Sequence, residues 1–285
     1  MNALIIGCGY LGGALAARLL AAGRTVHGTV RAPAGVERLR ALGISPLTLQ
    51  VENPHSYGPL HATLRGTGPW EAFYCVPPGT GDDPRGDVAR IAAVLAQHGV
   101  LRAVLTSSTA VYGDRGGEPV DADTPAAPTD GRGRRLKDIE DAWLSLGERA
   151  RIVRLAGLYG PGRIVGMSTL LQGQSVGGDP EDLLNLIHVE DAAALLQAVA
   201  EGQGAAAIEL GADGLPLRRR DYYRHLAARL GVPCQFGRAD DTVGLARRRS
   251  GSRACRIDPT CARTGWQPRH RDARPALDQL LASRR

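Results

Sequence analysis

Three glycines at the start of the chain constrain its fold more than any other feature. They are Gly7, Gly9 and Gly12. A short apolar run, Asn2 to Ile6, precedes them, and apolar residues fall on one helical stripe in the segment that follows, Tyr10 to Ala22. In this context the first glycine permits a tight turn, the second lets the backbone approach a pyrophosphate, and the third lets helix and strand pack closely. The pattern therefore predicts a strand, a phosphate-binding turn and a helix.

The start of the predicted helix is where a dinucleotide would bind. The first N–H groups of a helix lack intrahelical partners and lie at the positive end of its dipole. Those of Tyr10 and Leu11 are therefore expected to face the phosphates. A glycine turn that binds nothing is the alternative, but its position between a strand and a helix favours the dinucleotide.

The residue after the second predicted strand bears on which dinucleotide binds. The β-branched run Thr25 to Val30 completes a βαβ unit of the usual length and is followed by Arg31. Sites that prefer NAD carry an acidic residue here for the ribose hydroxyls, whereas a guanidinium can pair with a 2′-phosphate. We therefore predict NADP(H) as the cofactor, with NAD as the alternative. Arg31 as an ordinary surface charge is the other interpretation.

Strands and helices continue to alternate over the first 160 residues, as they do where right-handed crossover helices join parallel strands. The further predicted elements are a helix at 34–42, strands at 46–51 and 72–76, a helix at 87–97, a strand at 101–106, a helix at 138–146 and a strand at 151–155. The predicted fold class is thus α/β, a Rossmann doubly wound parallel sheet.

The alternation loosens after residue 160, and glycine is frequent as far as residue 180. We predict an NAD(P)-binding Rossmann domain over residues 1–160, to which residues 185–210 return. Residues 161–184 and 211–285 are expected to form a smaller C-terminal substrate lobe. Asp191 is the predicted N-cap of the returning helix.

Composition excludes several classes of protein. Hydrophobic residues make up 43% of the chain and charged residues 22%, which indicates a globular protein, and no apolar run reaches the ~18 residues of a membrane span. The densest basic cluster consists of Arg247 to Arg249, Arg253 and Arg256, without interleaved aromatic residues. In a chain of net charge +6, this cluster indicates a solvated face or a rim for an anionic substrate, rather than a nucleic-acid patch.

The cysteines point to a reducing compartment. None of the five belongs to a close C-x-x-C pair, and no secretory leader precedes the first predicted strand. We therefore expect free thiols in a cytoplasmic protein. The cysteines and histidines show no spacing typical of zinc ligands, so no metal is predicted.

Three further segments carry a resemblance to a known superfamily. Residues 106–113 (TSSTAVYG), 153–162 (VRLAGLYGPG) and 185–191 (NLIHVED) together resemble the extended short-chain dehydrogenase/reductases, which include nucleotide-sugar epimerases and dehydratases. Residues 265–268 (GWQP) are similar to the closing segment of that superfamily. The first two segments are most similar to an atypical bacterial subgroup, the YeeZ-like proteins, whose substrates are poorly defined.

The resemblance implies roles for particular residues. In this superfamily a serine or threonine polarises a substrate carbonyl, a tyrosine serves as acid or base, and a lysine four residues later lowers the tyrosine pKa and holds the nicotinamide ribose. Ser108 matches the polarising position, with Ser107 beside it at the cofactor. A strand-end serine that satisfies backbone groups is the alternative for Ser108.

The tyrosine position of that pattern holds Gly133, while the lysine is present as Lys137, the one lysine of the chain. A compact ammonium with a tunable pKa suits the family role, and an ordinary exposed lysine beside acidic residues is the alternative. Tyr112, Tyr159 or a bound water remain as proton carriers. We favour Tyr112, against the alternative that it is a packed aromatic residue.

Two other positions bear on the substrate and on the active site. Gly157 stands where many nucleotide-sugar enzymes carry an asparagine that contacts substrate, so a nucleotide-sugar substrate is disfavoured. His188 titrates near neutrality, but in its segment it is expected to be a structural or cleft-lining group.

Two functions remain open at this point. The first is an NADP(H)-dependent oxidoreductase or epimerase-like enzyme for a small carbonyl or hydroxyl compound, in which the protein orients the cofactor. The second is a cofactor-binding protein that has lost catalysis and reports the NADP(H) redox state. A homodimer that pairs the helices at 87–97 and 138–146 is also expected.

Overall fold

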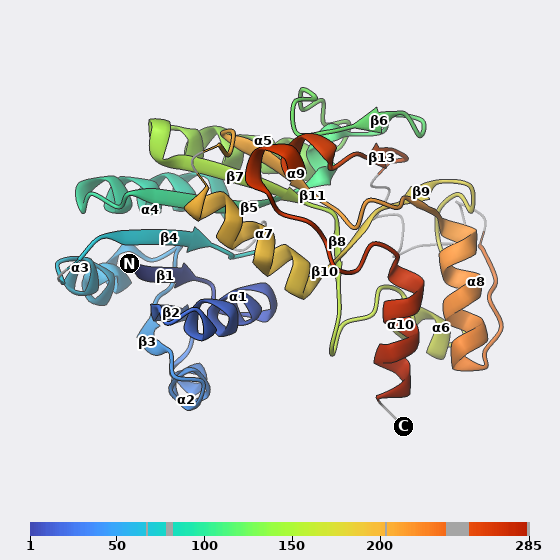
Figure 1. The fold of residues 1–285 in the computed structure, drawn as a ribbon, viewed down its shortest axis with the longest axis horizontal. Helices are drawn as coiled ribbons and strands as arrows, with labels where there is room; N and C mark the ends of the chain where they lie inside the picture. Colours follow the sequence, from blue (N-terminus) through green and yellow to red (C-terminus); the bar gives the residue numbers. More distant parts are fainter. Residues whose placement is uncertain (67, 78–81, 203, 238–250, 284–285) are drawn as a thin grey trace.

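The structure is a computed structural model, and it describes residues 1–66, 68–77, 82–202, 204–237 and 251–283 (Figure 1). Seven strands form the central sheet, in the order β3-β2-β1-β4-β5-β7-β11. Every neighbouring pair is parallel. The strands are β1 (Asn2–Ile6), β2 (Thr25–Val30), β3 (Ser45–Thr48), β4 (Trp70–Tyr74), β5 (Arg102–Ser108), β7 (Ala150–Leu155) and β11 (Ile208–Gly211).

This order confirms the predicted Rossmann fold. The sheet grows from β1 to β3 in one direction, and the chain then returns to place β4 on the other side of β1. The strand order thus reverses at β1 and β4, and ligands of doubly wound sheets bind outside the carboxyl ends of the strands at such a point. The glycine turn follows β1 and therefore lies there.

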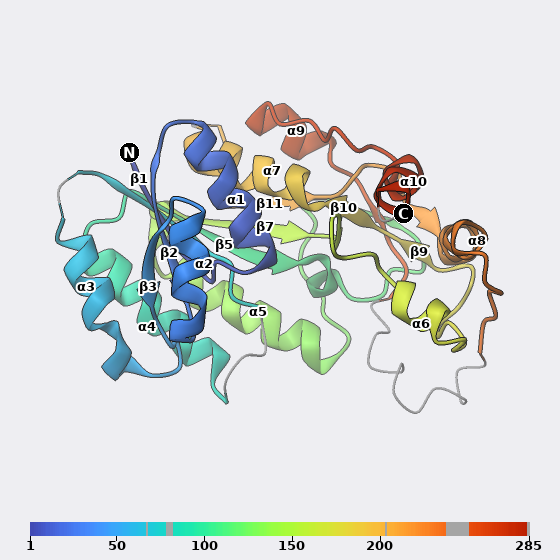
Figure 2. The ribbon, with the colours of Figure 1, turned by 90° about the horizontal axis from the view of Figure 1, so that it is seen from below.

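Helices cover both faces of the sheet (Figure 2). One face carries α1 (Tyr10–Ala21), α2 (Val36–Ala41) and α7 (Val189–Glu201), and the other carries α3 (Gly58–Leu64), α4 (Pro84–Gln97) and α5 (Gly131–Leu144). Successive residues of a strand point to opposite faces. In β1, Ala3 and Ile5 accordingly pack in one core while Leu4 and Ile6 pack in the other. Burial on both sides is why β1 is a continuous apolar run.

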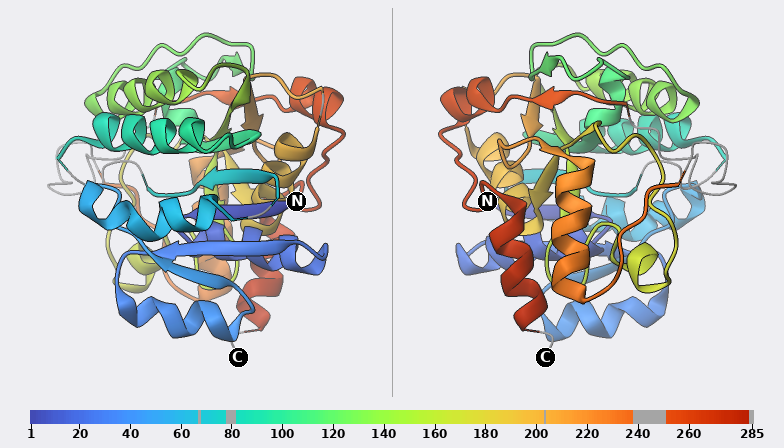
Figure 3. Two further views of the ribbon diagram at one scale, coloured as in Figure 1. Left: turned by 90° about the vertical axis from the view of Figure 1, so that its left-hand side faces the viewer. Right: turned by 90° about the vertical axis from the view of Figure 1, so that its right-hand side faces the viewer.

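A third hydrophobic core lies beyond the carboxyl end of the sheet. It includes Tyr159, Tyr222 and Leu277. The helices around it are α6 (Met167–Leu171), α8 (Arg219–Leu230) and α10 (Ala273–Ala282), and α8 and α10 lie side by side (Figure 3). The division of the chain into two lobes at the predicted boundaries stays a prediction.

Three pairs of short strands connect this region to the sheet. β8 (Gly157–Tyr159) pairs in parallel with β10 (Leu186–His188), and β9 (Leu183–Leu184) pairs antiparallel with β12 (Leu217–Arg218). β6 (Pro119–Val120) pairs in parallel with β13 (Ala254–Cys255), and α9 (Asp258–Thr264) follows. The third pair brings the C-terminal part of the chain next to the segment after β5.

Several boundaries differ from the sequence predictions. β4 covers Trp70–Tyr74 rather than 72–76, and α5 begins at Gly131 rather than at 138. The Asp130 side chain accepts from the Gly133 N–H at 2.6 Å, and this cap starts α5 in a stretch whose glycines hide it from pattern reading. Helix α3 and strand β11 were not predicted.

The prediction that Asp191 caps α7 is wrong. The N-cap is His188, whose Nδ1 accepts from the Glu190 N–H at 3.3 Å. The Asp191 carboxylate instead accepts from the backbone N–H groups of Arg269 and His270, both at 2.9 Å, and from the His270 ring. It is 2% exposed, so its lone pairs must be satisfied inside the protein.

Within the described ranges, none of the helices combines the length and the apolar character that a bilayer crossing requires.

Candidate functional site

The glycine turn has the geometry that its sequence predicts. Gly7 has a φ of +89°, and a Cβ on it would lie 2.9 Å from the Val76 backbone nitrogen. A Cβ on Gly12 would lie 2.4 Å from the Gly7 carbonyl oxygen. Packing therefore requires glycine at both places. At Gly9 nothing lies within 4 Å of such a Cβ, so the middle of the turn faces open space.

The N-terminus of α1 can accept an anion. No side chain caps it, as is also the case for α2, α3, α6, α8 and α9, and its first turn contains no acidic residue. What distinguishes α1 is the open space beside its N-cap, Gly9. First N–H groups without an intrahelical partner next to such a space fit the pyrophosphate of a dinucleotide.

Two arginines lie near this turn. Arg31 is exposed and forms an ion pair with Glu52. Arg38, on α2, donates from Nη2 to the Cys8 carbonyl at 2.8 Å. Sequence reasoning found Arg31 and missed Arg38, which lies at the start of the next helix, α2. Sequence reasoning also missed Glu52, the ion-pair partner of Arg31. A carboxylate near this position can act as an acceptor for a ribose hydroxyl.

Ser108 stands at the carboxyl end of β5, at the same edge of the sheet as the glycine turn. It is the N-cap of a 3₁₀ turn, η3 (Thr109–Tyr112), and its hydroxyl accepts from the Ala110 N–H at 3.3 Å. This is the backbone role that the sequence left open. Because the hydroxyl accepts there, its own proton remains free to be donated.

Ser107 points into the protein instead. Its hydroxyl donates to Glu140 Oε1 at 2.7 Å in a buried network. The same carboxylate receives two bonds from Arg154, Nε to Oε1 at 3.0 Å and Nη2 to Oε2 at 2.7 Å. The Ser107 hydroxyl is thus committed to Glu140, and the predicted cofactor contact of Ser107 finds no support in this arrangement.

The Glu140–Arg154 pair is almost completely enclosed, with side chains 1% and 2% exposed. Burial alone would lower the pKa of Arg154, but the hydrogen bonds and the charge of Glu140 raise it above the ordinary value. The guanidinium also lies 4.9 Å from the centre of the Tyr112 ring. The pair therefore packs against Tyr112, which belongs to the 3₁₀ turn that Ser108 caps.

The Tyr112 side chain lies inside the protein. It is buried, and its hydroxyl donates to the Asp121 carbonyl at 2.6 Å. Burial raises the pKa of Tyr112 to about 12, which the nearby Arg154 only partly offsets. The hypothesis that Tyr112 carries the proton is therefore not supported, and it takes the packed aromatic role instead. Tyr159 is likewise fully buried, and burial raises its pKa.

The position of the missing tyrosine is closed by packing. A Cβ on Gly133 would lie 2.8 Å from the Pro128 Cβ and 3.0 Å from the Ala110 carbonyl oxygen. Lys137, one turn along α5, is half-exposed and pairs with Asp141. Lys137 thus lies on α5, which begins earlier than predicted, and packing leaves no room for a side chain four residues before it.

A histidine pair lies at the start of α7. The rings of His188 and His270 stack at 3.9 Å with an interplanar angle of 29°. Burial, and then the charge of His270, lower the pKa of His188. With Glu190 the two rings offer three potential metal-ligand atoms within 4.8 Å of one another. The nitrogen lone pairs lie in the ring planes, so stacked rings cannot direct them at one ion, and the absence of a metal stays a prediction.

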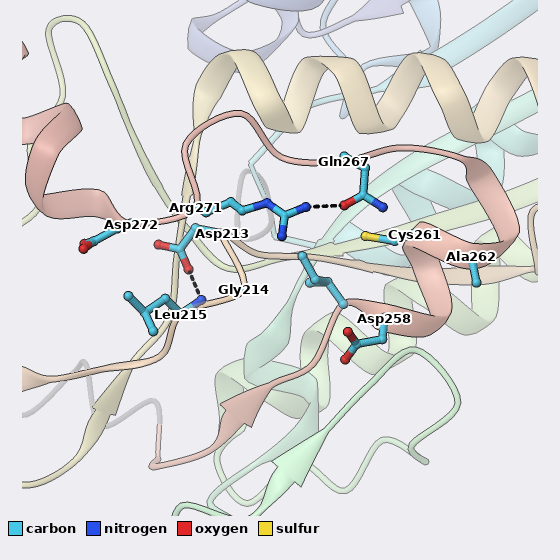
Figure 4. Close-up of a pocket in the computed structure, with 10 residues that line it drawn as sticks. Asp213, Gly214, Leu215, Asp258, Cys261, Ala262, Gln267, Arg271 and Asp272 are labelled. Carbon is cyan, nitrogen blue, oxygen red and sulfur yellow. Dashed lines mark hydrogen bonds between the residues drawn. The ribbon is translucent and has the colours of Figure 1, made fainter.

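A cavity of about 680 Å³ lies between α9, the loop after β11 and the segment before α10 (Figure 4). None of the predicted site residues lines it. Its notable group is Asp213, whose Oδ1 accepts from the Leu215 N–H at 3.1 Å, while Oδ2 has no partner among the described residues. Burial raises the pKa of Asp213 to about 8.

Comparison with known proteins places the chain in a class. No protein-family model matches it. Protein YeeZ of Escherichia coli strain K12 is 33% identical over 268 residues, which cover 88% of this chain and 92% of YeeZ. Among solved structures, a conserved protein of unknown function from Silicibacter pomeroyi is 29% identical, with a TM-score of 0.80 and coverage of 99% of both chains. A candidate NAD-dependent epimerase/dehydratase from Methylobacillus flagellatus is 26% identical, with a TM-score of 0.77, over 99% of this chain and 98% of that one.

The parallel sheet, the glycine turn and the serine at the end of β5 define an extended short-chain dehydrogenase/reductase of the epimerase/dehydratase kind. The similarity to YeeZ spans nearly the whole chain. Within that superfamily the chain belongs to the YeeZ family. The resemblance seen in the sequence is thereby confirmed.

Proposed function

We propose that the protein is an NADP(H)-dependent oxidoreductase or epimerase-like enzyme that acts on a small carbonyl or hydroxyl compound in the cytoplasm. The observation that carries the proposal is the uncapped start of α1 beside the open space at Gly9. The Methylobacillus flagellatus relative, named for NAD dependence, supports a nicotinamide cofactor.

Each part of the cofactor has protein groups to meet it. The turn at Gly7, Gly9 and Gly12, with the first N–H groups of α1, would hold the pyrophosphate. Arg31 and Arg38 supply guanidinium groups for a 2′-phosphate, and this favours NADP(H) over NAD. Lys137 would hold the nicotinamide ribose.

The chemistry divides between the cofactor and the protein. When bound, the nicotinamide supplies or accepts the hydride. Ser108 would donate its hydroxyl proton to the substrate oxygen as a hydrogen bond and so stabilise the charge that develops on it. Because Gly133 replaces the tyrosine and Tyr112 is bonded to Asp121, we assign the proton transfer to a bound water.

The second candidate is a protein that binds NADP(H) without turnover and reports its redox state. The observation that favours it is the closed packing at Gly133, which removes the family's acid. Both candidates share the cofactor, and they differ in whether any carbonyl or hydroxyl compound is converted.

Calorimetry with NADP⁺, NADPH, NAD⁺ and NADH tests the shared claim. We expect binding of the phosphorylated pair, and loss of that preference in Arg31→Ala and Arg38→Ala. Arg40→Ala is the matched control, since Arg40 lies on α2, is exposed and pairs with Glu37, its one ion-pair partner among the residues that the structure describes. Absence of heat with all four dinucleotides at millimolar concentration would refute the proposal.

Turnover separates the two candidates. NADPH absorbance is followed with a panel of small carbonyl compounds, for the wild type and for Ser108→Ala. Turnover that Ser108→Ala abolishes at unchanged cofactor affinity supports the enzyme. Tight, redox-selective binding without turnover supports the sensor. Size-exclusion chromatography of the same samples tests the proposed homodimer.

A further inference from the structure

Arg253 is a buried arginine that the proposed chemistry does not yet use. It directly precedes β13 and is 3% exposed. Its Nη1 donates to the Thr109 carbonyl at 2.9 Å, and Nη2 has a long bond of 3.4 Å to the Gly251 carbonyl. Nε has no partner among the described residues. The guanidinium therefore lies against the residue that follows Ser108.

Arg154 provides an internal comparison. It is buried to the same degree, at 2% exposure, but its Nε and Nη2 both bond to the Glu140 carboxylate. The corresponding edge of Arg253 has no carboxylate within 4.0 Å in the part of the chain that the structure describes. Burial lowers the pKa of Arg253, whereas the pKa of Arg154 is raised. Among the described residues, one buried guanidinium thus has a carboxylate partner and the other has none.

Two described acidic residues whose charges act on Arg253 do not form an ion pair with it. Asp114 accepts from the N–H groups of Gly116 and Ser252, at 3.0 and 2.9 Å. Asp130 caps α5 at Gly133. The charges of Asp114 and Asp130 raise the pKa of Arg253, but burial lowers it by more. A buried charge without a counter-ion is unfavourable, so an anion from outside the protein would be strongly favoured there.

We propose that Arg253 binds a carboxylate of the substrate, and that the substrate is a small hydroxy or oxo acid. This inference rests on the proposed function, because it names the substrate class of the same site. The planar guanidinium fork matches a carboxylate bidentately, as Glu140 shows at Arg154. Arg253 donates to the carbonyl of Thr109, the residue after Ser108, so an acid bound by Arg253 would lie next to Ser108 along the chain.

The arginines of the basic cluster found in the sequence do not share one environment. Arg247 to Arg249 lie outside the described residues. Arg256 is exposed, and it pairs with Asp258 at 3.3 Å. It lies three residues from Arg253 but turns to solvent, so Arg256→Gln is a matched control for the loss of one positive charge.

The test compares 2-oxobutyrate, its uncharged amide and inorganic phosphate by titration calorimetry, with and without saturating NADP⁺. The wild type is expected to bind the acid at least about tenfold more tightly than the amide, as the loss of a charge-assisted hydrogen-bond pair implies. Arg253→Met should lose this preference at unchanged dinucleotide affinity, Arg253→Lys should keep part of it, and Arg256→Gln should keep all of it.

Three results would overturn the inference. They are equal affinity of the wild type for acid and amide, a preference for phosphate over the acid, and retention of the acid preference in Arg253→Met. The first two need only the wild type, so the inference remains testable if Arg253→Met does not fold. Dinucleotide binding without acid binding defeats this inference alone, whereas acid binding through Arg253 without dinucleotide binding defeats only the proposed function.

Discussion

Replacing Glu140 with glutamine leaves the enclosed Arg154 charge without its counter-ion. The side chains are 1% and 2% exposed, so water cannot substitute for the carboxylate. Removal of one partner of such a pair costs about 3–5 kcal/mol, a large part of the roughly 5–15 kcal/mol that stabilises a typical domain. The variant keeps the volume of the side chain and an oxygen that can accept from Ser107, so the loss reports the charge.

Urea unfolding followed by circular dichroism measures this loss, and a double-mutant cycle assigns it. Arg154→Met removes the charge that Glu140→Gln strands, so the double variant is expected to be more stable than Glu140→Gln alone. A loss below about 1 kcal/mol in Glu140→Gln, or a double variant whose loss equals the sum of the single losses, would refute the reasoning. The measurement is independent of any ligand.

Three further predictions concern packing and protonation. Gly133→Ala should lower stability by about 1–3 kcal/mol, because its Cβ meets Pro128 and the Ala110 carbonyl, and a thermal melt that moves by less than about 2 °C would contradict this. Gly12→Ala places a Cβ 2.4 Å from the Gly7 carbonyl oxygen and should abolish dinucleotide binding in calorimetry, which unchanged affinity would disprove. Asp213 keeps its proton in the folded protein up to about pH 8, whereas the unfolded chain releases it above the ordinary carboxyl value of 3.8. The contribution of this group to the free energy of unfolding therefore falls as pH rises from about 3.8 to about 8 and is constant above pH 8. Urea titrations should accordingly show Asp213→Asn gaining stability relative to the wild type between pH 5 and pH 8. A difference that stays constant over this range would count against the raised pKa of Asp213.

The elements that could be predicted from the sequence are those whose pattern is local. β1 and β2 agree residue for residue with the prediction, β1 because a strand buried on both faces is rich in apolar residues and β2 because of its β-branched residues. The start of α5 was missed because it depends on a side-chain cap at Asp130 in a stretch of glycine and arginine. A cap is visible only when the helix that it begins is already recognised.

The parts of the site that the sequence could not predict depend on long-range contacts. Arg253 and Thr109 are far apart along the chain, and the bonds between residues 114–120 and 252–256, which include the pairing of β6 with β13, bring them together. The burial of Tyr112 likewise follows from its bond to Asp121 and from the pair beneath it. The resemblance located Ser108 and Lys137 in the sequence, but only the structure shows which groups their side chains contact.

The bonds of Asp191 join residues 266–270 to α7, a helix that packs on the central sheet. One carboxylate on α7 receives the Arg269 and His270 amides, and the Asp191 carbonyl receives the Trp266 indole N–H at 3.1 Å. The same helix packs along α1, which begins at the glycine turn. Truncation that removes residues 266–270 would leave the buried Asp191 carboxylate without these donors, so we expect it to loosen α7 against α1 and to weaken the proposed nucleotide binding at the opposite end of the sequence.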